Sequence, residues 1–357
     1  MFPHSILPFL YSLRPLRSRR LIFRPMKIHP KEVKAKILLH RRIGPDYFCL
    51  RLLCPDIARS AQPGQFILLR VNELRDPFLR RPFSFSQILP SKGKGTRPED
   101  EGAVEIGYKI VGRGTSLMTQ LREGQRLDVL GPLGKGFWEV GGQERAILVG
   151  GGIGVAPLLP WAERLQGEKR KKKKASKKLE ENPEVLVLIG GKSRDKVLGM
   201  RELKKIGCEP QVATEDGSLG MQGLATDLLE RELMTQGSKS ASLYACGPMP
   251  MLARVAQIAD QFDLPCQVLM EARMACGVGA CLGCAVKVKE YASGRTSESE
   301  DPTAAREGIV PAGECGEGEM GSAKESMVPM ITEGTAFRYA RACKEGPVFE
   351  AKEILWE

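Results

Sequence analysis

The most informative residues of this chain are three cysteines separated by short, unequal gaps. Cys276, Cys281 and Cys284 have four and then two residues between them, which is the spacing of a plant-type 2Fe-2S loop. Glycines stand among these thiols, and glycine lets a tight loop adopt positive φ and turn its amides toward anionic sulfur. The pattern predicts an iron-sulfur cluster and therefore one-electron chemistry.

Two other uses of these thiols fit a cysteine-rich segment: a zinc knuckle, and structural cysteines that bind no metal. Zinc sites usually combine paired short gaps, often with histidine, and the chain has no histidine after His40. The same lack excludes a Rieske-type centre, which needs two histidine ligands. We therefore expect a 2Fe-2S cluster; a yellow-brown colour would separate it from both alternatives.

Two polar segments upstream predict a flavin site when they are taken together. The first is Arg81, Pro82, Phe83 and Ser84, expected at the end of a strand, where a guanidinium fork and a hydroxyl can bind a pyrophosphate. The second segment ends a predicted strand in a glycine-rich turn and contributes Gly107, Tyr108, Lys109, Gly114 and Thr115. Alone, the first segment fits an edge-strand turn equally well.

A run of glycines predicts a second nucleotide site. A continuous apolar strand over residues 146–149 leads into Gly150, Gly151, Gly152 and Gly154 and then into a predicted helix. Backbone amides and the dipole of a helix that begins there favour a dinucleotide phosphate. The glycines are contiguous, unlike the usual six-residue fingerprint, and a tight strand-to-helix turn is the alternative.

Cys246, Gly247 and Pro248 follow another buried strand, over residues 242–245. Ligands of open α/β sheets bind at the carboxyl ends of the strands, so we expect this thiol to face a nicotinamide ring; a buried cysteine in a turn is the alternative. The basic and hydroxyl-bearing residues 192–194 follow a further strand and suit a 2′-phosphate. The residues alone therefore do not decide whether the coenzyme is NAD or NADP.

The elements that must position these residues follow two patterns. Short β-rich runs with Gly/Pro turns over residues 31–142 predict an antiparallel Greek-key β-barrel. Over residues 143–270 apolar strands alternate with helices, which predicts a doubly wound parallel α/β domain. Residues 271–357 are left for a small C-terminal 2Fe-2S domain. The predicted fold class is thus multidomain, α/β plus β.

Three segments fall outside this plan. Residues 1–30 are a basic extension, which we attribute to a start upstream of Met26, with a targeting segment as the alternative. Residues 167–180 are a lysine-rich insertion in the connection between two strands. Residues 291–335 are an acidic, low-complexity insertion that we expect to be flexible.

Charge and apolar content exclude several classes of partner. The net charge of +11 comes mainly from the first two of these segments, and no aromatic residues interleave the lysine run, so we expect no nucleic-acid partner. No apolar run reaches the length of a membrane span, so we expect no membrane partner. The ten cysteines without a signal peptide favour a cytoplasmic protein.

The order of the motifs resembles the ferredoxin-reductase superfamily and, within it, the electron transfer subunits of NAD-linked dihydroorotate dehydrogenase B. The resemblance covers about residues 30–290 and 337–355, and the run Met-Ala-Cys-Gly-Val-Gly-Ala-Cys at 274–281 is its most specific part. It implies that the three domains bind FAD, NAD and a 2Fe-2S cluster in that order. Residues 81–84, 107–109 and 114–115 would then hold FAD, and residues 150–154 and 246–248 would border NAD.

The fourth cluster ligand departs from the family pattern. Family members place it soon after the third, whereas the next cysteines here are Cys315 and Cys343. Cys343 stands in a segment that matches the closing segment of the family, and Cys315 lies in the acidic insertion. The resemblance therefore implies Cys343 as the fourth ligand; the long detour is tolerable because loop-closure entropy grows only logarithmically with length.

The resemblance also implies an activity and a partner. It describes an oxidoreductase subunit, without catalytic residues of its own, that passes electrons from an FMN-containing dihydroorotate dehydrogenase catalytic subunit through the 2Fe-2S cluster and FAD to NAD+ in pyrimidine (UMP) biosynthesis. Two catalytic and two electron transfer subunits would form a heterotetramer. The alternative is a flavin and iron-sulfur NAD(P)H oxidoreductase subunit of another complex, of the hydrogenase, sulfite reductase or NADPH:ferredoxin oxidoreductase type.

Overall fold

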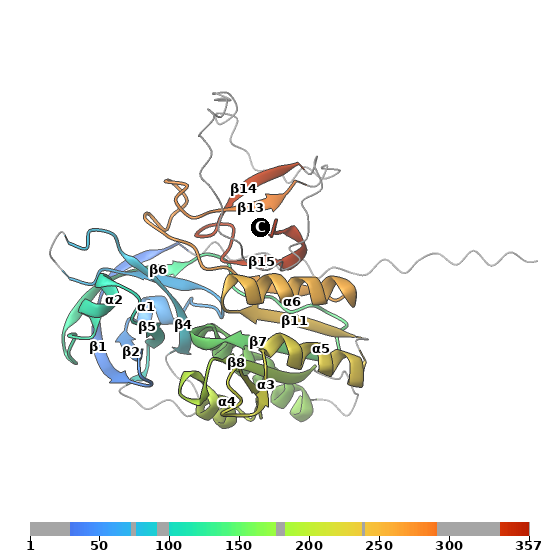
Figure 1. The fold of residues 1–357 in the computed structure, drawn as a ribbon. Coiled ribbons are helices and arrows are strands. Elements are labelled where there is room, and N and C mark those ends of the chain that lie inside the picture. Colours follow the sequence, from blue (N-terminus) through green and yellow to red (C-terminus); the bar gives the residue numbers. More distant parts are fainter. Residues whose placement is uncertain are drawn as a thin grey trace, which may run out of the picture.

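The computed structural model of the chain describes residues 29–72, 76–90, 100–175, 183–237, 240–290 and 336–356. Figure 1 shows the barrel, the α/β domain and the C-terminal cluster segment side by side. The extension before residue 29, the end of the lysine-rich insertion and the acidic insertion with Cys315 lie outside the described residues, so what we expect of them stays a prediction.

The first unit is a closed barrel whose described strands pair antiparallel in the order β1-β2-β5-β4-β3-β6. The strands are β1 (Lys31–Arg42), β2 (Tyr47–Leu53), β3 (Phe66–Leu69), β4 (Arg81–Leu89), β5 (Ala103–Lys109) and β6 (Arg126–Leu133), with the short helices α1 (Pro55–Ala58) and α2 (Arg113–Met118) in their connections. Alternate side chains such as Ile67 and Leu69 fill the interior. The Greek-key prediction is confirmed, but Arg81 begins a strand, where we had expected residues 81–84 at the end of one.

The second unit is a seven-stranded sheet in the order β10-β9-β8-β7-β11-β12-β15. Its strands are β7 (Arg145–Gly151), β8 (Glu184–Gly191), β9 (Gln211–Thr214), β10 (Met221–Gln222), β11 (Ala241–Cys246), β12 (Cys266–Leu269) and β15 (Val348–Glu350), all parallel except β15. The chain passes from β7 to β8 and β9 on one side and then returns to β11 on the other. The strand order therefore reverses between β7 and β11, where doubly wound sheets bind ligands.

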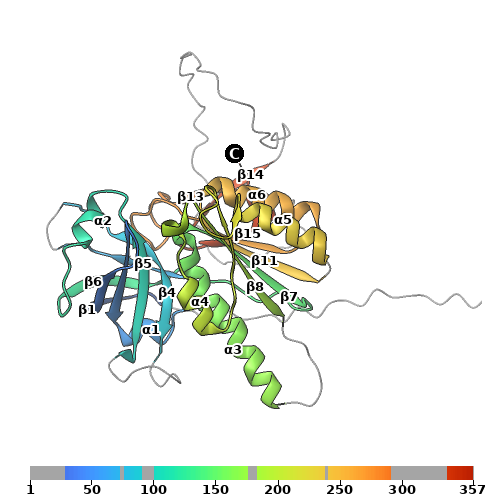
Figure 2. The same cartoon turned by 60° about the horizontal axis from the view of Figure 1, so that its bottom comes forward.

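Helices cover both faces of this sheet (Figure 2). They are η2 (Gly152–Leu158), α3 (Leu159–Ala175), η3 (Arg194–Lys196), α4 (Met200–Ile206), α5 (Ala225–Gln236), α6 (Met249–Gln261) and η4 (Ala351–Glu353), where η marks a 3-10 helix. Ile147 and Val149 of β7 pack with α5 and α6, and the alternate residues Ala146 and Leu148 pack with Trp161 of α3 on the other face. Such burial on both faces explains the continuous apolar runs seen in the sequence. The helix α3 continues to Ala175 and therefore includes the first part of the lysine-rich insertion, in the connection between β7 and β8.

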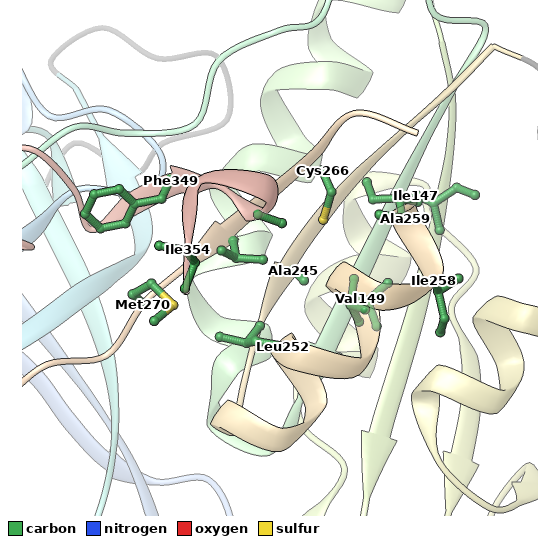
Figure 3. Close-up of a cluster of buried hydrophobic side chains, with 14 of the residues drawn as sticks. Ile147, Val149, Ala245, Leu252, Ile258, Ala259, Cys266, Met270, Phe349 and Ile354 are labelled. Carbon is green, nitrogen blue, oxygen red and sulfur yellow. The ribbon is translucent and has the colours of Figure 1, made fainter. Parts of the chain in front are cut away.

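The third unit consists of the loop 271–284 and the antiparallel strands β13 (Ala285–Lys289) and β14 (Phe337–Arg341). It is not self-contained, because the chain then returns to the α/β sheet as β15, beside β12. Figure 3 shows Phe349 and Ile354 of this returning segment in the same apolar cluster as Met270 and Leu252. The division at residue 271 therefore differs from the structure, which gives the last residues to the α/β domain.

No helix in the described part of the chain is both long and apolar enough to span a bilayer.

Candidate cofactor and cluster site

The cluster loop folds around its own sulfurs. Gly277 and Gly279 have φ of 72° and 87°, the left-handed conformation that only glycine adopts without cost. The Ala280 amide donates to Cys276 Sγ at 3.3 Å, and the Cys343 amide donates to Cys284 Sγ at 3.4 Å. The amides thus point at the thiols, as a loop that binds an anionic cluster requires.

These contacts move the pKa values of two thiols in opposite directions. Burial would raise the pKa of Cys276, but hydrogen bonds from the backbone of Val278, Cys281 and Ala280 lower it to about 6. Burial raises the pKa of Cys343 to about 12, and the neighbouring Cys284 thiol acts in the same direction. A bound cation is what would let all four sulfurs ionise together.

The four predicted cluster residues come together as two pairs. Cys276 shares a side-chain hydrogen bond with Cys281, and Cys343 shares one with Cys284. Within the described residues, no three histidine, cysteine or acidic side chains converge on a point that could hold a single metal ion. Pairs of thiols fit a 2Fe-2S cluster, where each iron takes two protein ligands, better than a structural zinc, which takes four at one point.

Two salt bridges hold the fourth cysteine and the loop together. Glu345 accepts hydrogen bonds from the side chains of Arg338 (2.7 Å) and Arg341 (3.0 Å), and these arginines lower the pKa of its carboxyl even though burial acts to raise it. Arg341 also donates to the Gly279 carbonyl in the loop at 3.0 Å. Sequence reasoning missed this clamp, although the Arg-x-x-x-Glu spacing beside Cys343 is a visible signal.

The cluster loop rests on the barrel next to the predicted flavin strand. A Cβ placed on Gly277 would collide with Leu68 of β3, and Leu68 lies directly opposite Pro82 of β4. Opposed residues of neighbouring strands point to the same face and lie about 5 Å apart. Only one strand therefore separates the cluster loop from residues 81–84.

The structure joins the two segments of the predicted flavin site. Arg81 lies against Gly114, where an added Cβ would be 2.8 Å from Arg81 Nε. Thr115 Oγ1 accepts hydrogen bonds from the amides of Val111 (2.9 Å) and Gly112 (3.2 Å) and donates to the Gly112 carbonyl at 3.0 Å. The Thr115 hydroxyl therefore shapes the turn. Arg81 donates through Nη1 to the Leu79 carbonyl, and the rest of its guanidinium fork and the backbone around Gly114 are left to meet a ligand.

Tyr108 is placed differently from its neighbours in the flavin motif. Its side chain is buried inside the barrel, and Tyr108 Oη lies 2.9 Å from Nε2 of His40. The adjacent Gly107 faces the α/β domain, where an added Cβ would lie 3.3 Å from both Ile153 and Ala156. Tyr108 can therefore offer a ligand only its backbone, and Gly107 marks the line along which the two domains meet.

The glycine loop and the Cys246 turn form one edge of the sheet. Gly150 pairs with Cys246 across β7 and β11, and a Cβ on Gly154 would collide with the Cys246 carbonyl oxygen. A Cβ on Gly151 would lie 2.9 Å from Pro248 Cδ. The glycines are thus required by close backbone packing, and the predicted α-helix after them begins instead as the 3-10 helix η2, with the α-helix starting at Leu159.

The Cys246 side chain does not face this edge as we expected. It is 1% exposed within the core cluster that includes Trp161, and burial raises its pKa well above the usual value. The thiol is therefore neutral and packed, and it is the backbone of the Cys246-Gly247-Pro248 turn that borders the glycine loop.

Ser193 and Arg194, the second and third residues of the segment 192–194, make contacts within the protein. The Ser193 hydroxyl donates to the Asp195 carboxylate, and Arg194 Nε donates to the Ser218 carbonyl at 3.2 Å. Asp216 accepts from the Ser218 hydroxyl at 2.6 Å, and these hydrogen bonds lower the pKa of both aspartates. Two carboxylates beside the basic residues oppose the binding of an additional phosphate group.

Comparison with known proteins agrees with this arrangement. The family model described as the iron-sulfur cluster binding domain of dihydroorotate dehydrogenase B matches residues 271–296. In structure, the chain is similar to an NADH-dependent reduced ferredoxin-NADP oxidoreductase, with 25% identity, a TM-score of 0.63 and coverage of 91% of this chain and 90% of that one. It also shares the fold of a ferredoxin reductase in carbazole 1,9a-dioxygenase, at 21% identity, a TM-score of 0.52 and coverage of 67% and 68%.

Two relatives match this chain over nearly their whole length. The chain is 31% identical over 327 residues to the dihydroorotate dehydrogenase B (NAD(+)) electron transfer subunit of Desulforamulus reducens, covering 92% of this chain and 99% of the relative. It is 36% identical over 324 residues to the same subunit of Geobacillus thermodenitrificans, covering 89% and 96%. The chain therefore belongs to the family of dihydroorotate dehydrogenase B (NAD(+)) electron transfer subunits.

Proposed function

We propose that this chain accepts electrons from an FMN-containing dihydroorotate dehydrogenase catalytic subunit and delivers them to NAD+, as a step of pyrimidine biosynthesis. One spatial relationship carries the proposal. The cluster loop touches Leu68, which lies opposite Pro82 in the flavin strand, and Gly107 of the flavin site touches Ile153 of the glycine loop. The three candidate sites thus follow one another without a gap.

Each site offers groups suited to one cofactor. We assign Cys276, Cys281, Cys284 and Cys343 to a 2Fe-2S cluster, because their thiols form two pairs beneath amides that favour negative charge. We assign Arg81 with the backbone of residues 82–84, 107–109 and 114–115 to FAD, and the backbone of residues 150–154 and 246–248 to NAD. When bound, the cluster carries single electrons and the flavin converts them into pairs that leave as hydride.

The chain's own residues shield and orient these groups. Arg81 offers a guanidinium fork that matches a pyrophosphate, and Gly107 lets the two domains approach closely at the line where flavin and nicotinamide would meet. The buried Cys246 thiol takes no part in proton transfer, since burial keeps it neutral. The role of these residues is thus to position the cofactors.

The electrostatics after β8 and β9 favour NAD over NADP. Asp195 and Asp216 are held ionised by their hydroxyl partners, and Arg194 is engaged by Ser218. A 2′-phosphate brought to this edge would be repelled by these two carboxylates. We infer that NADH is oxidised with a clearly higher kcat/KM than NADPH.

We infer a cytoplasmic heterotetramer of two such chains and two catalytic subunits. The barrel and the α/β sheet account for the described residues outside the cluster segment, so dihydroorotate has to be oxidised on the partner. None of the nine described cysteines forms a disulfide with another of them, which suits a reducing compartment.

The purified chain, loaded with FAD and the cluster, tests the proposal. It should oxidise NADH with an artificial one-electron acceptor and show no turnover of dihydroorotate. Adding the FMN subunit should then give dihydroorotate-dependent reduction of NAD+. Turnover of dihydroorotate by the lone chain, or complete loss of NADH oxidation despite bound FAD, would refute it.

A further inference from the structure

One contact between the barrel and the α/β domain lies outside the cofactor motifs. The turn between β1 and β2 meets residues 193–199, which follow β8. Lys196 Nζ lies 3.1 Å from Asp46 Oδ2, and a Cβ on Gly44 would lie 3.7 Å from Leu198 Cδ2. An ion pair and an apolar contact therefore tie this turn to the second domain.

Tyr47 follows the turn and is 4% exposed. The ammonium groups of Lys109 and Lys196 lie over its ring, 5.8 Å and 5.9 Å from the centroid, a geometry in which the ring face attracts cations. Lys109 comes from the paired strand β5 and Lys196 from the α/β domain. Burial raises the pKa of the Tyr47 phenol, so the side chain stays neutral.

The outer end of Tyr47 reaches the glycine loop. A Cβ on Gly152 would have Tyr47 Oη as its nearest neighbour, at 4.0 Å, and Gly152 has a φ of 55°, in the left-handed region. The same loop is supported from the other domain, where a Cβ on Gly199 would lie 2.6 Å from Val155 Cγ1. Tyr47 therefore stands where the barrel, residues 193–199 and the glycine loop meet.

We propose that Tyr47 is a positioning residue for the dinucleotide: its ring, held by the Asp46–Lys196 ion pair, keeps the glycine loop of residues 150–154 in its binding conformation. The inference rests on the proposed function, since that loop is assigned there to NAD. A loop whose amides are already oriented loses less conformational freedom when the ligand binds. The affinity for the dinucleotide then depends on packing by the ring, while the chemical step does not.

Substitutions at Tyr47 separate the ring from the hydroxyl. In the flavin- and cluster-loaded chain, assayed with NADH and ferricyanide, Tyr47→Leu should raise KM for NADH about tenfold with kcat changed less than about twofold. Tyr47→Phe keeps the ring and should stay within about twofold of wild-type KM. Equal losses in both variants would mean that the hydroxyl, the part of Tyr47 nearest Gly152, carries the effect and would overturn the role given to the ring, as would an unchanged KM in Tyr47→Leu.

The ion pair supplies a second test that leaves the ring in place. Asp46→Asn and Lys196→Met should each raise KM about threefold. Because Lys196 also pairs with Asp195 and lies over the Tyr47 ring, the double variant should be no worse than Lys196→Met alone. Lys204 lies on α4 and forms an exposed ion pair with Glu209. Lys204→Met removes this pair, serves as the control and should leave KM unchanged. If Tyr47→Leu fails to retain FAD, Asp46→Asn and Lys196→Met decide the question. A wild-type KM for NADH in both of these variants would then overturn the proposal.

These experiments distinguish failure of the Tyr47 proposal from failure of the proposed function. Absence of NADH oxidation by the wild-type chain with FAD bound would count against the proposed function. Normal NADH oxidation that is insensitive to Tyr47→Leu, Asp46→Asn and Lys196→Met would count against Tyr47 alone.

Discussion

The amide of Cys343 donates a hydrogen bond to Sγ of Cys284 at 3.4 Å, although the two residues are 59 positions apart in the chain. This contact closes the cluster loop across a segment that the structure does not describe. Cys343 is held there by its neighbours, since β15 begins five residues later and joins the α/β sheet. The fourth predicted ligand thus lies in the turn that leads from β14 of the cluster segment to β15 of the α/β sheet.

Replacing Cys343 and Cys315 one at a time should show which of them is the fourth ligand of the cluster. Cys343→Ser should abolish the visible absorption of the cluster, because a hydroxyl of high pKa replaces a thiolate ligand. Cys315→Ser should leave the spectrum and the iron content unchanged. Iron and sulfide analysis of both purified variants checks this, and the opposite pattern would assign the fourth ligand to Cys315.

The cluster loop and the domain plan were accessible from sequence because their signals are local. The spacing of Cys276, Cys281 and Cys284 and the apolar run before Gly150 depend on residues that are neighbours in the chain. The strand β15 has three residues and pairs only with β12, so no pattern within it could have predicted its place in the sheet. Its position follows from tertiary contacts such as Phe349 on the apolar cluster.

Side-chain directions at the sites were the least predictable part. Whether Cys246 faces the ligand edge or the core depends on which face of β11 is covered by α3, and the sequence of β11 is apolar on both faces. The Thr115 hydroxyl resembled a group that would bind a ligand, but it accepts hydrogen bonds from the backbone amides of its own turn. Polar side chains at turns often form hydrogen bonds with nearby backbone groups rather than with a ligand. The spacing of residues in the sequence does not show which of these partners is chosen.

Arg81 should dominate the affinity for FAD. A hydrogen bond to a charged group contributes about 1.5–3 kcal/mol, so Arg81→Ala should weaken FAD binding by about 10- to 150-fold. Arg81→Lys should recover only part of this loss, because lysine lacks the planar fork. Arg122→Ala, which removes an exposed arginine between α2 and β6, is the control. Titration of the apoprotein by quenching of flavin fluorescence gives the constants; equal affinity in Arg81→Ala and wild type would remove Arg81 from the site.

Gly154→Ala should damage the dinucleotide edge. The new methyl group collides with the Cys246 carbonyl oxygen. Since a Cβ is fixed to its own backbone and the carbonyl belongs to the backbone of β11, η2 must move away from β11, at a cost of about 1–3 kcal/mol. We expect a lower melting temperature and a higher KM for NADH with FAD still bound. Gly141→Ala, where an added Cβ meets nothing within 4 Å, should match wild type. A wild-type KM in Gly154→Ala would contradict the packing described for this edge.

Glu345 should make the stability of the cluster segment depend on pH. Although burial opposes the shift, Arg338 and Arg341 lower the pKa of its carboxyl from the ordinary 4.5, so its contribution is complete above about pH 5 and is lost as the pH falls through 4.5 and below. Glu345→Gln should therefore cost about 1 kcal/mol at pH 7, and its melting temperature should approach that of wild type near pH 4. Calorimetry across this range checks the trend, with Glu209→Gln as the exposed control; a gap that widens on acidification would contradict it.

The central claim is that electrons pass through the cluster held by Cys343 on their way to the flavin, and reconstitution with the catalytic partner tests it most directly. In the reconstituted complex, Cys343→Ser should abolish dihydroorotate-dependent reduction of NAD+, while the same variant chain still oxidises NADH with ferricyanide through its FAD. Retained dihydroorotate-dependent reduction of NAD+ in a complex shown to lack cluster iron would contradict the account.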